Sequence, residues 1–290
     1  MRGEGKVRSK SKLSLLVLLL TLTSYSLLTF AQSEAPLFAS IRSASKVTVA
    51  LASNPPYQFV LPSGELTGSG GDLQNMVLKS MGLPALTPIF TDWNAMIPGL
   101  QAHQFDYVGA GLSITAERCK VVIFSAPFYA AQTGIYVLPG NPKHLTSLAD
   151  IARRPDIKLA AIVSGELAYA REQGVKPEQI ITVPEIQAGA ATVIGGRANA
   201  FITGQFTIPN PQQKGLEVVV DKQSPVFGAG MAFRKEDKQF RDAYNEHLVP
   251  LLRNGIVQKL YAKYGIANGD TQARLLANVN KASDIVPSCE

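Results

Sequence analysis

The chain has 290 residues, of which 46% are hydrophobic and 17% are charged, with 24 glycines and 18 prolines. This length and apolar content suffice for one large or two medium domains with buried cores, and they exclude a wholly disordered chain. The formal net charge of +6 would suit an anionic partner such as nucleic acid or a membrane surface. The distribution of that charge argues against such a partner.

The positive charge is concentrated at the start of the chain. Residues 1–12 carry five basic side chains and one acidic one, and the 19 residues 13–31 carry no charge. This layout is typical of a secretory signal peptide cut near Ala31, although the run is also long enough for a membrane anchor. Without residues 1–31 the chain has 23 basic and 21 acidic residues, a net charge of +2. We therefore expect export to the periplasm and no nucleic-acid partner.

The exported part begins with a polar, alanine- and serine-rich stretch, residues 32–45, which we expect to be a mobile tail. The β-branched run 46–52 then predicts a strand. Apolar residues at three- and four-residue steps from Asp72 predict a helix that ends at Gly82 and Pro84. Further strands are predicted at 85–90, 107–110 and 134–138, and a helix at 93–101. Strands alternating with helices indicate βαβ units and a mainly parallel sheet.

A second series of alternating elements follows Pro139. Strands are predicted at 158–163, 180–183, 199–203, 216–220 and 228–233, and helices at 147–152, 166–173 and 186–194. The last long stretch, 238–264, has helical spacing of its apolar residues, with an expected interruption at Pro250. The sequence therefore predicts two α/β lobes.

The extended segments 134–138 and 228–233 lie on either side of the second series. We expect the second lobe, residues 135–227, to be an insertion joined to the first by two hinge strands. The first lobe then comprises residues 46–134 and 228–290. A cleft between hinged lobes is a common place for a small ligand.

Several segments resemble the solute-binding proteins of bacterial polar amino-acid ABC importers, extracellular solute-binding family three. The matching stretches cover most of residues 46–265 and read PPYQF, LTGSGGDL, WNAMIPGLQAHQFDYVGAGLSITAERCKVVIFSAPF and RKEDKQFRDAYNEHLVPLLRNGIVQKLYAKYG. In the family, W-x3-IP-x-L, FD, SIT-x-ER and FS-x-P stand at similar mutual spacing. The RC pair at 118–119 and the GNP at 140–142 are most similar to ectoine- and hydroxyectoine-binding members.

The resemblance implies a type II periplasmic-binding-protein fold with a ligand cleft between two lobes. It also implies that the protein is a monomer without a cofactor or catalytic activity. Its partners would be a small zwitterion or cation and the membrane permease of an ABC importer. Closure of the lobes around the ligand would select the form that the permease recognises.

Arg118, in the SIT-x-ER segment, is the strongest candidate for ligand binding. The resemblance implies that its guanidinium holds the carboxylate of the ligand through two parallel hydrogen bonds. Thr115 would add a hydroxyl donor, and the backbone of Ser113 would accept hydrogens from a ligand cation. On residue type alone, Arg118 would instead be a surface arginine paired with Glu117.

Two aromatic residues are candidates for the walls of the pocket. Tyr57 follows two prolines that restrict its loop, and Trp93 begins a predicted helix where the family directs an aromatic ring inward. Two ring faces would favour a delocalised or alkylated cation. Both rings would equally suit the core. Asn54, in the preceding turn, belongs to the same predicted ligand set.

Two positions depart from the family pattern. Gly204 stands where α-amino-acid binders usually have an aspartate for the ammonium group, which argues against a simple primary α-amino acid. Gly165 and Glu166 stand where the family often has Gly-Thr at the start of a helix in the second lobe. Glu166 is either the partner of a ligand cation or a favourable acid in the first turn of a helix. These three residues complete the predicted ligand set.

The sequence contains two cysteines, Cys119 and Cys289. In an oxidising compartment we expect them to form a disulfide, which would stabilise the fold by about 2–4 kcal/mol. Two unrelated thiols are the alternative.

Two other functions would use the same scaffold. An enzyme similar to periplasmic cyclohexadienyl dehydratases would need a positioned acid or base, for which Glu166 is the only obvious candidate. A ligand-sensing partner of a membrane receptor would need a separate signalling protein. His103, His144 and His247 are scattered and form no metal-binding motif, so we expect no metal.

Overall fold

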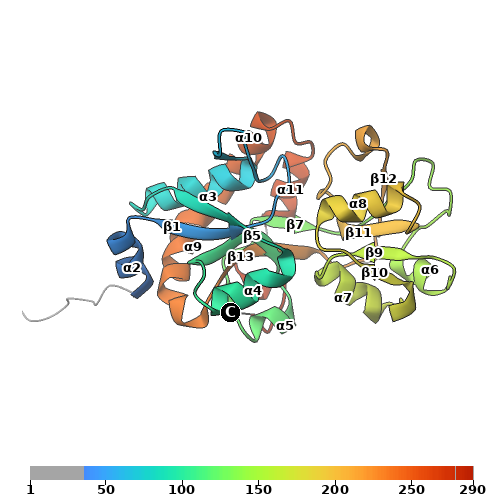
Figure 1. Ribbon diagram of the computed structural model, residues 1–290, viewed down its shortest axis with the longest axis horizontal. Coiled ribbons are helices and arrows are strands. Elements are labelled where there is room, and N and C mark those ends of the chain that lie inside the picture. The colour runs from blue at the N-terminus through green and yellow to red at the C-terminus, as the bar shows by residue number, and fades with distance from the viewer. Residues whose placement is uncertain (1–35, 278, 290) are drawn as a thin grey trace, which may run out of the picture. The chain divides into compact units, whose positions relative to one another are not determined.

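The computed structural model describes residues 36–277 and 279–289, and the predicted signal peptide lies outside them. Two sheets covered by helices account for most of this part of the chain (Figure 1). No helix among the described residues is long and apolar enough to cross a membrane.

The first sheet contains a parallel half and an antiparallel half. Its strands, in spatial order, are β4 (Leu86–Phe90), β1 (Val47–Leu51), β5 (Tyr107–Ser113), β13 (Phe227–Phe233) and β6 (Ile123–Phe124), and β7 (Tyr129–Ala131) also pairs with β13. β1 is parallel to β4 and β5, whereas β13 is antiparallel to its three neighbours. Four of the five β1 residues are buried, as expected for a strand covered on both faces.

Seven helices and a short hairpin complete what we call the first lobe. They are α2 (Pro36–Ala44), α3 (Ser69–Ser80), α4 (Trp93–Gln101), α5 (Ala116–Cys119), α9 (Lys238–Arg253), α10 (Ile256–Lys263), α11 (Gly269–Leu276) and the hairpin of β2 (Phe59–Val60) and β3 (Leu66–Thr67). The core contains a cluster of aromatic rings. The ring of Phe233 lies 5.4 Å from Tyr107, 6.0 Å from Phe240 and 5.6 Å from Tyr244, between centroids.

The second sheet and its helices form what we call the second lobe. Its strands, in spatial order, are β10 (Ile180–Thr182), β9 (Leu159–Ala161), β11 (Ala200–Gly204), β8 (Thr133–Val137) and β12 (Glu217–Val220), and its helices are α6 (Leu148–Ala152), α7 (Gly165–Glu172) and α8 (Ile186–Ile194). β9, β10 and β11 are parallel, whereas β8 is antiparallel to β11 and β12. Short 3-10 turns occur at Pro177–Gln179, Pro211–Lys214, Lys235–Asp237 and Ala282–Asp284.

The chain passes between the two sheets twice. Gln132 separates β7 from β8, and residues 221–226 separate β12 from β13. The two crossings are joined, because the Gln132 side chain donates to the Ser224 carbonyl (3.1 Å) and the Thr133 N–H donates to the Ser224 hydroxyl (2.9 Å). The predicted boundaries at 134/135 and 227/228 lie within a few residues of these crossings. As limits of two domains they remain a prediction.

The segment expected to be a mobile tail is mostly helical in the structure. Pro36–Ala44 forms α2, in which Leu37 and Ile41 are buried against the core of the first lobe. The ring of Phe38 lies 4.8 Å from that of Phe240. The polar composition of residues 32–45 was therefore misleading, because one apolar face at four-residue spacing is enough to attach a short helix.

Pro250 does not interrupt the helix in which it lies. α9 continues through it to Arg253, and the break comes at Gly255, where a φ of +73° separates α9 from α10. Pro250 and Glu246 are both exposed, so water can reach the carbonyl that loses its usual N–H donor. The expected interruption was thus placed a few residues too early.

The expected disulfide between Cys119 and Cys289 is present. It fastens the C-terminal segment to α5. Ile285, in the same segment, packs against Gly228 of β13, where an added Cβ would lie 2.6 Å from the isoleucine side chain. The end of the described chain therefore contacts both the α5 turn and the strand that returns from the second lobe.

Candidate functional site

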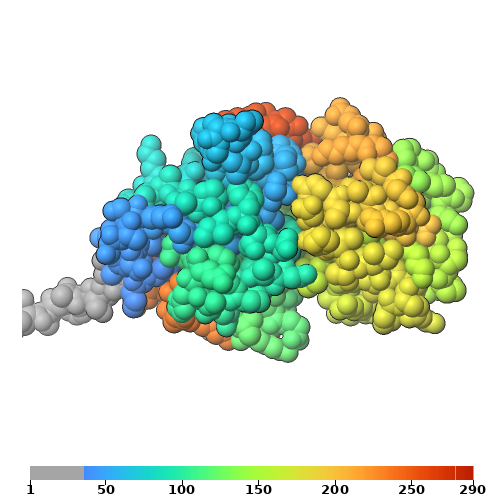
Figure 2. Space-filling model, viewed as in Figure 1, coloured from blue at the N-terminus to red at the C-terminus, as the bar shows by residue number. Residues whose placement is uncertain are grey.

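A cavity of about 110 Å³ lies between the two lobes. We call it the cleft. A single water needs roughly 10–15 Å³ of such space, so the cleft has room for a molecule of about ten non-hydrogen atoms, the size of an amino acid. In Figure 2 the two lobes are in contact along the visible face. A ligand in the cleft would therefore be shielded from bulk water on that side.

Arg118 brings a positive charge into the cleft. The Thr115 hydroxyl accepts the backbone N–H of Arg118 (3.3 Å) and so caps α5. The Arg118 guanidinium donates to the carbonyl of Ser113 (2.8 Å) and, across the cleft, to that of Val163 (2.9 Å). These bonds use two of the five guanidinium N–H groups and leave three for a ligand. Glu117 pairs with Lys120 (2.7 Å), so the alternative pairing of Arg118 with Glu117 is not observed.

Burial lowers the pKa of Arg118 but does not remove its charge. Loss of hydration lowers the pKa of its guanidinium to about 10, and the nearby Glu166 carboxylate opposes this shift. Arg118 therefore remains positively charged at neutral pH. With two backbone carbonyls holding its orientation, its remaining donors suit a carboxylate that binds through both oxygens.

Glu166 brings a negative charge into the cleft from the second lobe. It lies in the first turn of α7, where the Ser164 hydroxyl accepts the Leu167 N–H (3.4 Å) as the helix cap. The side chain is only 5% exposed and lines the cleft. Burial raises the pKa of Glu166, while its own backbone N–H, Ser164 and Arg118 favour the charged form. The first-turn position and the cleft position are thus compatible.

Aromatic rings form much of the cleft wall. Tyr57 and Trp93 line it as predicted, together with Phe128, Tyr129 and Tyr261, which the sequence analysis did not single out. The Tyr57 and Tyr261 rings meet edge to face at 5.9 Å between centroids. Phe128 and Tyr129 directly follow the FS-x-P segment, a signal that could have identified them. Tyr261 comes from α10, and only the tertiary structure reveals it.

Gly111 allows one of these rings to reach the cleft. It lies in β5 with a φ of +81°, which glycine adopts without strain, and a Cβ there would lie 2.9 Å from the Phe128 ring. Any larger residue at this position would displace the ring from the wall.

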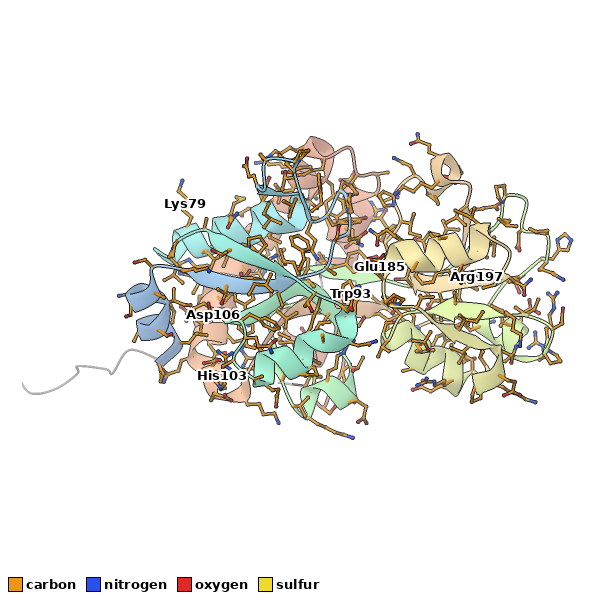
Figure 3. All side chains as sticks on the ribbon, viewed as in Figure 1. Lys79, Trp93, His103, Asp106, Glu185 and Arg197 are labelled. Carbon is orange, nitrogen blue, oxygen red and sulfur yellow. A yellow bond between two sulfur atoms is a disulfide. The ribbon has the colours of Figure 1, made fainter. Side chains whose placement is uncertain are left out.

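Trp93 lies where the two lobes meet (Figure 3). Its ring packs against buried side chains of the first lobe and also against a cluster in the second lobe that includes Ile186 and Phe201. Core packing and cleft lining, the two alternatives for this residue, are therefore both observed.

Asn54 and Ser113 also line the cleft, whereas Thr115, Gly165 and Gly204 do not. Thr115 is used as the α5 cap described above. The backbone of Gly165 packs so closely that a Cβ would lie 2.9 Å from the Phe227 ring. The carbonyl of Ser113, expected to accept from a ligand, accepts from Arg118, and its oxygen has a second lone pair.

At Gly204 the space that an aspartate would need is occupied. An added Cβ would lie 2.6 Å from the Tyr129 hydroxyl and 3.1 Å from the Thr207 hydroxyl, and these two hydroxyls are themselves 3.3 Å apart. The structure thus gives a physical reason for glycine here. The charge of Glu166 contributes to the raised pKa of both Tyr129 and Tyr136.

Besides the contact between the Tyr129 and Thr207 hydroxyls, further hydrogen bonds cross between the lobes. The Tyr57 hydroxyl donates to the carbonyl of Phe206, and the Gln187 side chain donates to the carbonyl of Ser53 (3.0 Å). Together with the bond from Arg118 to Val163, they hold the lobes in a closed arrangement around the cleft.

The fold and the cleft define a class, the two-lobed binding proteins of the type II periplasmic fold. Among solved structures, EhuB in complex with hydroxyectoine has a TM-score of 0.75 and 29% sequence identity, covering 86% of this chain and 97% of that one. An ancestral amino-acid-binding protein, described as a precursor of cyclohexadienyl dehydratase, has a TM-score of 0.69 and 28% identity, covering 78% and 98%.

The model of the bacterial extracellular solute-binding proteins, family 3, matches residues 47–267, and the chain belongs to this family. A probable amino-acid ABC transporter periplasmic-binding protein of Sinorhizobium fredii is 31% identical over 238 residues, 78% of each chain. The lysine/arginine/ornithine-binding periplasmic protein of Escherichia coli is 27% identical over 250 residues, 81% of this chain and 91% of that one. The chain is thus a solute-binding protein for an ABC importer.

Proposed function

We propose that this protein binds a small zwitterionic or cationic solute, such as an amino acid or an ectoine-like compound, in the cleft and delivers it to an importer. The observation that supports this proposal best is the Arg118 guanidinium, which lies in a cavity of amino-acid size with three donors unused. In this proposal Arg118 holds the carboxylate, and Asn54, Tyr57 and Trp93 form the surrounding wall.

Delivery would depend on closure of the lobes. Contacts from both lobes stabilise the closed form when the solute is bound, and the population shifts toward the form that a permease recognises. The hinge would lie at the two crossings around Gln132 and residues 221–226. In this division residues 46–134 and 228–290 move as one lobe and residues 135–227 as the other.

We further place the protein in the periplasm, as a monomer, after removal of its signal peptide. The family is extracellular, which supports this location. We propose binding without catalysis. Glu166 is the only acidic side chain and no histidine is found among the described residues that line the cleft, so few groups could transfer a proton. Incubation with prephenate or arogenate, followed by absorbance, tests this point: turnover would favour the enzyme alternative.

Isothermal titration of the mature protein with a panel of amino acids, betaines and ectoines tests the proposed function. The best ligand should also raise the melting temperature, because it binds only the folded state. Arg118→Ala should then weaken its binding by about 30-fold or more, the usual effect of removing one partner of a buried charged pair. Lys120→Ala, on the same turn but exposed, should bind normally. Unchanged affinity in Arg118→Ala would remove the assigned role of this residue.

A further inference from the structure

The cleft wall carries one basic and one acidic side chain. Among the described residues that line it, Arg118 is the only base and Glu166 the only acid. The remaining polar groups of the wall are neutral hydroxyls and amides. Burial raises the pKa of Tyr57, Tyr129 and Tyr261, so these hydroxyls stay protonated. The wall thus supplies one positive charge from the first lobe and, from the second lobe, one carboxyl group whose charged form a ligand cation would favour.

This balance restricts the net charge of a ligand. A buried charge without an opposite partner is costly, because it loses its hydration without compensation. A ligand with one carboxylate and one cationic group gives each charge of the wall a partner. A ligand with a second cationic group would leave one positive charge buried without a partner, and a ligand with two carboxylates would do the same with a negative charge.

The position of the cation follows from the packing at the other end of the cleft. The space beside Gly204 is filled by the Tyr129 and Thr207 hydroxyls, which leaves no room there for an acidic side chain. Glu166 is 5% exposed and lines the cleft from the second lobe, opposite the α5 turn that carries Arg118. It is the acceptor available for a cationic group whose carboxylate lies on Arg118.

We propose that the cleft selects net-neutral zwitterions and that Glu166, by pairing with the ligand cation, is the residue that sets this specificity. This inference rests on the proposed solute-binding function and deepens it. It implies that net-cationic solutes bind weakly to this protein, although one of its relatives is named for binding lysine, arginine and ornithine. The rings of Tyr57, Trp93, Phe128 and Tyr261 on the cleft wall favour an alkylated or delocalised cation over a primary ammonium.

Titration of the wild-type protein with three groups of small solutes tests this inference. Proline, glycine betaine and ectoine are net-neutral, lysine and arginine are net-cationic, and glutamate is net-anionic. The net-neutral group should contain the tightest ligand. The lysine and arginine affinities should be lower by about 30-fold or more, because each leaves a buried cation unpaired.

Glu166→Gln provides the second part of the test. It keeps the shape of the side chain but makes the wall net-positive, so the variant should lose about 30-fold or more in affinity for the best net-neutral ligand and bind glutamate more tightly than the wild type does. A purely structural role would weaken all ligands alike. Glu172→Gln, an exposed change at the other end of α7, is the matched control and should bind as the wild type.

The possible failures are distinguishable. Tighter binding of lysine or arginine than of any net-neutral solute to the wild type would overturn the charge rule while leaving solute binding in place, and so would a Glu166→Gln variant with unchanged selectivity. If Glu166→Gln did not fold, the wild-type panel would still decide. Absence of binding by every solute in the panel would count against the proposed function itself.

Discussion

The hydroxyl of Tyr57 offers a direct test of how the cleft closes. It donates to the carbonyl of Phe206, so the bond joins a loop of the first lobe to a loop of the second. Tyr57→Phe removes this bond and leaves the ring in place against Tyr261. Since the bond exists only when the lobes are together, its loss should reduce the stability of the closed form and leave the open form unchanged.

The size of this effect follows from the surroundings of the bond. A neutral hydrogen bond contributes about 0.5–1.5 kcal/mol net, and water can partly replace the donor because Phe206 is only half-buried. We therefore expect a loss of about 1 kcal/mol, which weakens binding roughly fivefold. The factor should be the same for every ligand, whereas the effect of Glu166→Gln should depend on ligand charge.

Stopped-flow fluorescence of Trp93 measures this prediction directly. Trp93 is the only tryptophan in the chain and contacts the cores of both lobes, so its emission should report closure. Tyr57→Phe should raise the dissociation rate with little change in the association rate. Tyr264→Phe is the matched control, because its hydroxyl donates to Asp72 (2.8 Å) within the first lobe. Equal dissociation rates in the wild type and Tyr57→Phe would refute the proposed closure contact.

Three more predictions concern stability, each measured by urea-induced unfolding. Replacing Cys119 and Cys289 by serine should lower the free energy of unfolding by about 2–4 kcal/mol; no change would mean that the disulfide is absent or without effect. Gly204→Ala should cost about 1–3 kcal/mol by overpacking against the Tyr129 hydroxyl, and Tyr129→Phe in the same chain should recover part of this loss. Burial raises the pKa of Glu166, so the folded state binds a proton more readily than the unfolded state. The free energy of unfolding should therefore fall as pH rises above about 4.3. Glu166→Gln should remove this decrease, and a variant with the same pH profile as the wild type would contradict the prediction.

Local patterns in the sequence were sufficient for most of the fold. The β-branched run of β1 and the apolar spacing of α3 are short-range signals, and the structure has a strand and a helix there. The two errors involve weaker signals. Residues 36–44 have few apolar side chains, and the effect of Pro250 on α9 depends on which side of the helix faces water, which only packing decides.

The candidate site was predictable where one segment supplies the side chain and its support. Arg118 and the Thr115 hydroxyl that caps its helix are three residues apart, so the motif contains both. Tyr261 is on the cleft wall because α10 packs beside the Tyr57 loop, two segments more than 200 residues apart in the sequence. No local pattern carries that information.

The sequence by itself determined most elements of both lobes, because these depend on neighbouring residues, and it limited the cysteines to one possible pair. The arginine of the cleft was expected from the resemblance of its segment to a known family. Only the tertiary structure decided that Gly204 is closed off by Tyr129 and that Glu166 is buried in the cleft with Arg118. Burial and charge compensation are properties of groups brought together from distant segments, and their free energies depend on distances that the order of residues does not contain.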